Sequence, residues 1–112
     1  MVGQYPDQLP FEPVRFFVIS SVPKGTSRGQ HAHKSNQQIL VCLSGGLTSK
    51  FHDGQLWEEF RLRPNGDALH VPPMHFGELY DFLPDTILLV LASEEFDSEE
   101  YISVFEDFLT NF

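Results

Sequence analysis

Two histidines separated by a single residue, His31 and His33, are the part of this sequence best suited to chemistry. Side chains along an extended strand alternate between its two faces, so both imidazoles are expected on the same face. An imidazole has an unperturbed pKa of about 6.5 and can therefore accept and donate protons near neutral pH. Two imidazoles on one face could move a proton between neighbouring carbons of one substrate. The pattern predicts a general acid/base site.

The residues around the pair suit ligand binding better than core packing. Arg28 and Lys34 flank the histidines, and Gln38 begins the segment that leads into the apolar run 39–43. A lone histidine would more simply be a hydrogen-bonded polar residue with no chemistry. The two cations beside this pair favour a functional site.

The spacing of this segment resembles the first motif of the cupin barrels, which is matched here by Gly25, His31, His33, Gln38 and Gly45. In metal-binding cupins the position of Gln38 is a glutamate, and a third histidine comes from a later strand. Here that later position falls on Gly77, and His75 lies two residues too early. Two imidazoles and a neutral amide make a poor metal site. We expect no metal.

The elements that must hold these residues are short strands. The chain has 112 residues, of which 41% are hydrophobic and eleven are Phe, enough for one domain with a single core. Segments rich in strand formers alternate with turn signals such as Asp53-Gly54. The predicted strands are 14–20, 37–43, 47–51, 55–62, 68–71, 75–82 and 87–92. This is an all-β pattern, and the last strand is expected to be buried on both faces.

Both ends of the domain, which spans residues 1–112, are expected to be less regular. Residues 1–13 contain three prolines and read as an irregular lead-in, whereas 98–112 carry apolar residues at helical spacing. Seven of the sixteen acidic residues lie in 94–112, and we interpret them as the solvated face of that helix. His52, in a hairpin turn, is expected to be exposed.

Charge and composition exclude several classes of function. The net charge of −9 argues against nucleic-acid binding, which needs many cations. No apolar run is long enough for a transmembrane helix, so no membrane role is expected. The single cysteine, Cys42, lies in an apolar strand and excludes an internal disulfide, which indicates a cytoplasmic location.

A more specific resemblance is to the sugar 3,4-ketoisomerases, a family of cupin-fold enzymes that act on dTDP-4-keto-6-deoxyglucose. The sequence Arg28-Gly29-Gln30-His31-Ala32-His33-Lys34, followed by Gln38, looks like the signature of this family. Further matching segments are 9–12 with Arg15, Asp53-Gly54, 71–74, 80–82, 88–93, Tyr101-Ile102 and Phe108-Leu109. Together they span residues 9–109.

This resemblance implies a single cupin (jelly-roll) barrel with a short C-terminal helix, and a metal-free isomerisation without cofactor. The 4-keto group acidifies the proton on C3, a base removes it, and the enediol is reprotonated on C4. His31 and His33 match the acid/base pair, and Arg28 would hold the diphosphate or stabilise the enediolate. Lys34 and Gln38 would contact the nucleotide or the sugar. Family members work as homodimers on a dTDP-linked sugar.

The segment after Pro72-Pro73 supplies the remaining candidates for substrate binding, which are His75, Phe76, Glu78 and Tyr80. Phe76 stands where the family usually has a tryptophan, and 16–19 lack the tyrosine that members normally carry. Family members also usually begin with a longer N-terminal segment. Two alternatives remain at this point. One is a cupin that binds a nucleotide sugar without turnover, and the other is a small metal-dependent cupin enzyme.

Overall fold

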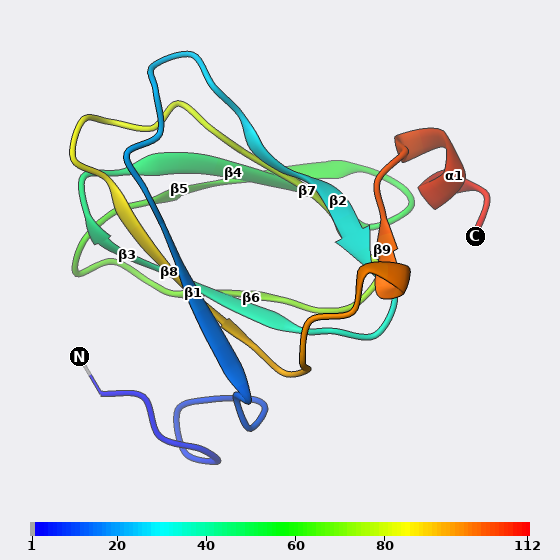
Figure 1. Cartoon of the computed structure of the whole chain (residues 1–112), viewed down its shortest axis with the longest axis horizontal. Coiled ribbons are helices and arrows are strands. Elements are labelled where there is room, and N and C mark those ends of the chain that lie inside the picture. Colours follow the sequence, from blue (N-terminus) through cyan, green and yellow to red (C-terminus); the bar gives the residue numbers. More distant parts are fainter. Residues whose placement is uncertain (1) are drawn as a thin grey trace.

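Two antiparallel sheets make up the molecule in the computed structural model, which describes residues 2–112. One sheet has the order β1 (Arg15–Ser20), β8 (Ile87–Ala92), β3 (Gln38–Ser44) and β6 (Leu69–Val71). The other has the order β5 (Trp57–Leu62), β4 (Leu47–His52), β7 (Phe76–Tyr80), β2 (Arg28–His33) and β9 (Tyr101–Ile102). The two sheets face each other (Figure 1). The predicted all-β class is confirmed.

The predicted turns join the strands largely as the sequence indicates. Asp53-Gly54 connects β4 to β5, with Gly54 at a positive φ and the Asp53 carboxylate accepting hydrogen bonds from the backbone N–H groups of Gln55 and Leu56. Between the two sheets, alternate residues of each strand point inward. The main core cluster consists of Leu40, Cys42, Leu47, Leu62, Val71, Leu79, Leu88 and Val90. No helix among residues 2–112 is long and apolar enough to cross a bilayer.

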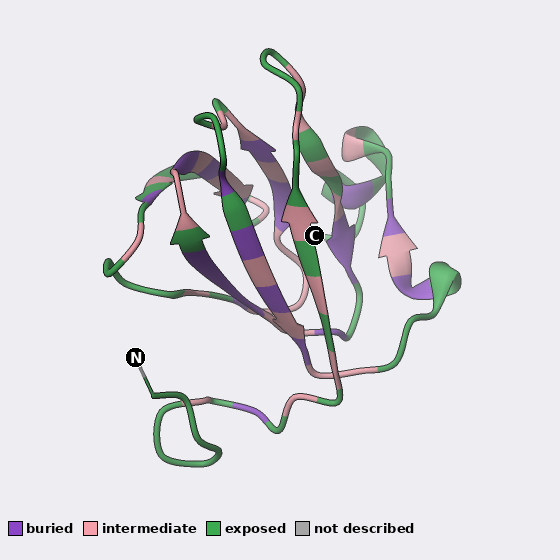
Figure 2. Cartoon of the chain, turned by 60° about the vertical axis from the view of Figure 1, so that its left-hand side comes forward, coloured by how far each residue is buried: buried purple, intermediate pink, exposed green. Residues whose placement is uncertain are grey.

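The expectation that 87–92 is buried on both faces is wrong. Leu88, Val90 and Ala92 face the interior, whereas Ile87 is exposed on the outer face of the four-stranded sheet. The N-terminal segment covers only part of that face, where Phe11 packs on β3. The alternation of exposed and covered residues along the strands of this sheet is visible in Figure 2. An apolar run on its own does not reveal how much of the outer face is covered.

The C-terminal segment is less helical than the sequence predicts. Ser98–Glu100 form a 3₁₀ helix, β9 follows it and pairs with β2, and only Phe105–Leu109 form the α-helix α1. The strand formers Tyr101 and Ile102 explain the interruption, since they add to the exposed edge of β2. Figure 1 shows α1 beside this end of the five-stranded sheet.

His52 is buried rather than exposed, with only 7% of its surface accessible. It closes β4, and its ring meets Trp57, Phe105 and Phe108 edge-on at centroid distances of 5.1, 5.2 and 6.0 Å. Its Nδ1 accepts a hydrogen bond from the backbone N–H of Gly54. The burial could not be seen locally, because two of the three rings that cover His52, those of Phe105 and Phe108, come from the far end of the chain.

Candidate active site

The two histidines of β2 lie side by side on its inner face. Nε2 of His31 is 3.2 Å from Nε2 of His33, and the two rings stand nearly perpendicular at 86°. Gly29, at a positive φ, precedes them where the register of β2 against β7 shifts. This irregularity lets Arg28 line the same cavity as the histidines. The predicted common face is therefore present.

A buried carboxylate holds the deeper of the two histidines. His33 is 5% exposed, and its Nδ1 is hydrogen-bonded to the Glu100 carboxylate. The other carboxylate oxygen accepts hydrogen bonds from the backbone N–H groups of Ser35 and Asn36 at 3.4 and 3.3 Å. The backbone N–H of Lys34 donates to the Glu100 carbonyl at 2.8 Å. The turn after β2 thus wraps around Glu100.

Burial sets the charge of the outer histidine. Desolvation, and secondarily the neighbouring His33, lower the pKa of His31 to about 4, while Glu100 acts in the opposite sense. His31 is therefore neutral near pH 7. The Tyr101 ring packs against both imidazoles, with centroids 4.8 Å from His31 and 4.4 Å from His33. This contact restricts the orientation of both rings.

The histidines face a cavity of about 210 Å³ between the sheets. Its polar groups are Arg28, His31, His33, Gln38 and His75, which come from β2, β3 and the loop before β7. Apolar side chains form the rest of the wall, among them Phe17, Ile19, Leu40, Phe51, Leu79 and Val90. A small, mostly apolar cavity with a few convergent polar groups is the usual form of a ligand site.

The donors in this cavity do not fit a metal ion. Among residues 2–112 no group of three His, Cys, Asp or Glu side chains is placed to hold one. At the position where the second cupin motif carries a histidine, Gly77 packs so closely on Phe51 that even a Cβ would overlap its ring. The two imidazoles are left with the neutral amide of Gln38.

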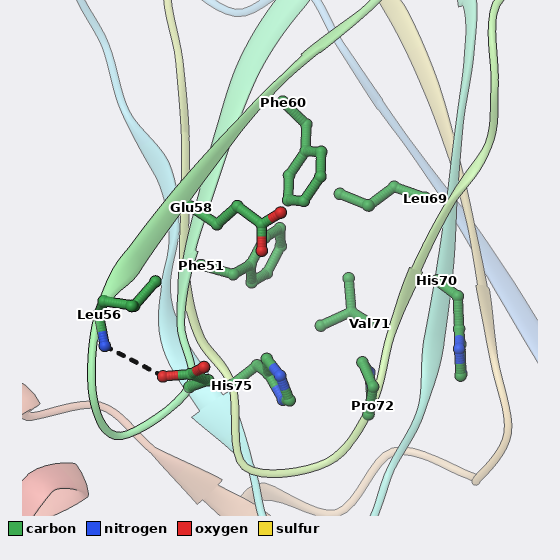
Figure 3. A pocket seen from close by; sticks show the side chains of 10 residues that line it. Phe51, Leu56, Glu58, Phe60, Leu69, His70, Val71, Pro72 and His75 are labelled. Carbon is green, nitrogen blue, oxygen red and sulfur yellow. Dashed lines mark hydrogen bonds between the residues drawn. The ribbon is translucent and has the colours of Figure 1, made fainter.

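A second cavity, of about 150 Å³, adjoins the first and is lined by Phe51, Val71 and His75 as well (Figure 3). His75 donates its Nδ1–H to the Pro73 carbonyl at 3.0 Å, and in a neutral ring with this tautomer Nε2 is an acceptor. Two carboxylates, of Asp53 and Glu58, line this second space. An anionic group is therefore favoured at the Arg28 end of the combined cavity and disfavoured here.

Comparison with known proteins agrees with this arrangement. The family described as WxcM-like, C-terminal (FdtA) has a model that matches residues 1–112. The chain belongs to the FdtA family. A curated relative, the TDP-4-oxo-6-deoxy-α-D-glucose 3,4-oxoisomerase of Aneurinibacillus thermoaerophilus, is 35% identical over 100 residues. The match covers 89% of this chain and 72% of that enzyme.

Solved structures of ketoisomerases have the same fold. The TDP-fucose 3,4-ketoisomerase WlaRA of Campylobacter jejuni superposes with a TM-score of 0.94 at 30% identity, covering 98% of this chain and 82% of that one. The 3,4-ketoisomerase QdtA of Thermoanaerobacterium thermosaccharolyticum, solved in complex with TDP, gives 0.90 at 30% identity, with 94% and 77% covered. The cupin jelly roll implied by the sequence is thus confirmed.

Four of the candidate binding residues of this FdtA family member lie outside the cavity. Phe76, Glu78 and Tyr80 point to the outer face of β7, because β7 begins at Phe76 and its inner face falls on Gly77 and Leu79. The other candidate is Lys34, which is exposed after β2. Its contact with substrate, like that of the β7 residues, stays a prediction.

The outer face of β7 has contacts of its own. Phe76 packs under α1, Glu78 forms an ion pair with Lys50 at 3.4 Å, and the Tyr80 hydroxyl donates to Glu59. The hydrogen bond to that carboxylate raises the pKa of Tyr80 to about 12. These contacts hold the outer surface of the five-stranded sheet together.

Sequence reasoning missed Glu100 and Tyr101 as site residues. The sequence places Glu100 on a solvated acidic face, but in the structure it is buried against His33. A signal was present, since an acid directly before the strand-forming pair Tyr101-Ile102 would be drawn inward if that pair joined a sheet.

Proposed function

We propose that this chain is a metal-independent TDP-sugar 3,4-ketoisomerase that converts dTDP-4-keto-6-deoxyglucose to its 3-keto isomer in deoxysugar biosynthesis. The observation that carries the proposal is the pair of facing imidazole Nε2 atoms, 3.2 Å apart, on the wall of a small cavity between the sheets. The activities of its relatives in the FdtA family support the same reaction. His31 and His33 are the proposed catalytic residues.

The reaction needs two proton movements. One proton leaves C3 and another arrives at C4, while the hydroxyl proton of O3 is lost and O4 gains one. C3 and C4 are bonded at about 1.5 Å, so two nitrogen atoms 3.2 Å apart can serve both carbons from one side of the sugar. A side chain within hydrogen-bond reach of the reacting proton is the geometric requirement for general acid/base catalysis.

The other cavity residues are assigned to binding. Arg28 is placed to pair with the diphosphate or with the charge that develops on the enediolate. Gln38 offers an amide that can donate and accept, and His75 offers the Nε2 acceptor described above, both suited to sugar hydroxyls. The carboxylates of the adjoining cavity would repel the diphosphate. The substrate is therefore expected to enter with its diphosphate at the Arg28 end.

We further propose that the protein is a homodimer that works in the cytoplasm without nucleic acid or membrane. The edge strand β1 exposes Phe16 and Val18, at 68% and 49% of their surface, beside the partly covered apolar face of its sheet. A second copy is a natural cover for such a surface. Light scattering should give a dimer, with Phe16→Glu shifting it to monomer and the equally exposed Phe112→Glu leaving it dimeric. A monomeric wild type would refute this part.

The test of the activity is incubation of metal-stripped protein with dTDP-4-keto-6-deoxyglucose, followed by proton NMR. A 3-keto-6-deoxyhexose product is expected, at the same rate with chelator present. Activity that returned only with an added divalent metal would point to a metal-dependent cupin. Binding of dTDP without any product would leave a nucleotide-sugar binding protein, and the proposal would be abandoned in either case.

A further inference from the structure

A small second core lies on the outer face of β2, directly behind the histidine pair. Ala32, the residue between the two histidines, points to this outer face and is 0% exposed. It packs in one cluster with Phe76 of β7, Ile102 of β9 and Phe108 of α1. The main core, by contrast, consists of residues from β3, β4, β5, β6, β7 and β8. The C-terminal segment therefore covers the back of the strand that carries the histidines.

β9 and α1 are too short to keep these positions without tertiary packing. β9 consists of Tyr101 and Ile102 and pairs only with Ala32 and His33 of β2. α1 has five residues, whereas an isolated helix in water needs roughly 12–15 to be even marginally stable. Phe108 of α1 is the largest fully buried side chain among residues 2–112. Burial of this ring is therefore the main force that holds the segment on the sheet.

Three rings on the outer face of the five-stranded sheet receive α1, and we call them the aromatic patch: His52 of β4, Trp57 of β5 and Phe76 of β7. Phe105 stacks on Trp57, with centroids 5.4 Å apart and planes 19° apart, and meets His52 edge-on at 5.2 Å. Phe108 meets Phe76 and His52 at 5.7 and 6.0 Å. Because β9 and β5 are opposite edges of this sheet, α1 fastens the edge strand β9 to the strands beyond β2 (Figure 1).

We propose that α1 (Phe105–Leu109) is a clasp that keeps the histidine pair in its reactive geometry, with Phe108 as the positioning residue. It acts through β9, because Tyr101 of that strand packs its ring 4.8 Å from the His31 ring and 4.4 Å from the His33 ring. This inference rests on the proposed function and extends it to a region outside the cavity. Phe108 lies on the face of β2 opposite the cavity, so it influences the reaction only through the strands.

Release of α1 would disturb turnover more than substrate binding. Without the clasp, β9 would be held only by its two residue pairs with β2. The Tyr101 ring would then leave the imidazoles, and Glu100, directly before β9, would be drawn away from His33. The cavity residues assigned to binding come from β2, β3 and the loop before β7, which do not belong to the C-terminal segment. A local opening of this kind requires less free energy than global unfolding.

A purely structural role for α1 is the competing explanation, and Phe108→Ala separates the two. The main core should keep the sheets folded, which circular dichroism can verify. Trp57 is the only tryptophan of the chain, so a red shift of its emission should report loss of the stacked Phe105. The kcat should fall about ten- to a hundredfold, with KM changed by less than about threefold. Phe108→Leu retains most of the apolar volume and should keep kcat within about threefold of wild type.

NMR of the histidine rings gives a second readout that needs no substrate. In Phe108→Ala the Cε1–H resonances of both imidazoles of β2 should shift, because they lose the ring current of Tyr101. The resonance of His70, on the other sheet, should not move. Tyr101→Leu should reproduce the shifts and the fall in kcat while the emission of Trp57 stays as in wild type. The two substitutions together should lower kcat no further than the stronger one alone, since both remove the same contact.

Phe112→Ala is the matched control. Phe112 meets Phe108 edge-on at 5.0 Å, but it is 64% exposed and its ring lies over Gly54. This substitution should leave kcat and the histidine resonances unchanged. The inference is overturned if Phe108→Ala keeps the wild-type kcat or histidine resonances, or if Tyr101→Leu keeps the wild-type kcat. It is equally overturned if Phe112→Ala loses as much kcat as Phe108→Ala. An inactive wild type whose variants show the expected resonance shifts would instead refute the proposed function.

Discussion

Replacing His31 by glutamine should change how the stability of the fold depends on pH. Burial lowers the pKa of His31 from 6.5 to about 4 in the folded protein, whereas the unfolded chain keeps the ordinary value. Between these two values the unfolded state binds more protons, so the free energy of unfolding falls as the pH is lowered through this window. The wild type loses this stability as the pH is lowered, whereas His31→Gln, which has no titrating ring at this position, does not.

The magnitude follows from the size of the shift. A lowering from 6.5 to about 4 would correspond to about 3 kcal/mol for a group sealed from water. The His31 ring keeps part of its contact with solvent, which screens charge, so about 1–2 kcal/mol is expected. This is the amount by which the stability difference between wild type and His31→Gln should change when the pH is lowered from about 7 to about 4.

Urea unfolding of both proteins across this range is the assay. Subtracting the two curves removes most of the contribution of the other titrating groups, which both chains share. The free energy of unfolding of His31→Gln, measured relative to that of the wild type, should be higher at about pH 4 than at about pH 7 by about 1–2 kcal/mol. A difference that stays constant with pH, or one that changes in the opposite sense, would refute the claim that His31 is buried as a neutral ring.

Three further substitutions test the shape and the charge of the cavity. Gly77→Ala should lower stability by about 1–3 kcal/mol, because its Cβ would overlap the Phe51 ring, and Phe51→Leu in the same chain should recover part of the loss in thermal unfolding. Gln38→Glu completes a set of two histidines and a carboxylate and should create Ni²⁺ or Zn²⁺ binding measurable by calorimetry, while turnover falls. Arg28→Ala should raise KM about ten- to a hundredfold, since a charge-assisted hydrogen bond to the substrate is lost. Unchanged stability, absent metal binding or an unchanged KM would contradict the respective argument.

The strands and the histidine pair could be predicted because they depend on local patterns. On any extended strand the His-x-His spacing places both imidazoles on the same face. Asp53-Gly54 favours a hairpin turn wherever two strands flank it. The role of Glu100 could not be predicted in this way, since its partner His33 lies 67 residues earlier in the chain. The burial of His52 likewise depends on aromatic rings of α1.

Which residues of β7 face the cavity is a second feature that could not be predicted from the sequence. The proline pair predicts a strand soon after it, but a shift of one residue in its start moves every side chain to the other face. Phe76, Glu78 and Tyr80 consequently point away from the cavity, while the turn residue His75 lines it. Only the pairing with β2 and β4 determines that register.

Exchange of the C3 proton of dTDP-4-keto-6-deoxyglucose in D₂O is the measurement that tests the central claim most directly. With metal-stripped wild type, proton NMR should show loss of the C3 signal and a 3-keto product carrying deuterium at C4. The double variant His31→Ala/His33→Ala, with its fold verified by circular dichroism, should show neither. Exchange in this double variant at the wild-type rate would contradict the account, because proton removal would then not depend on the histidine pair.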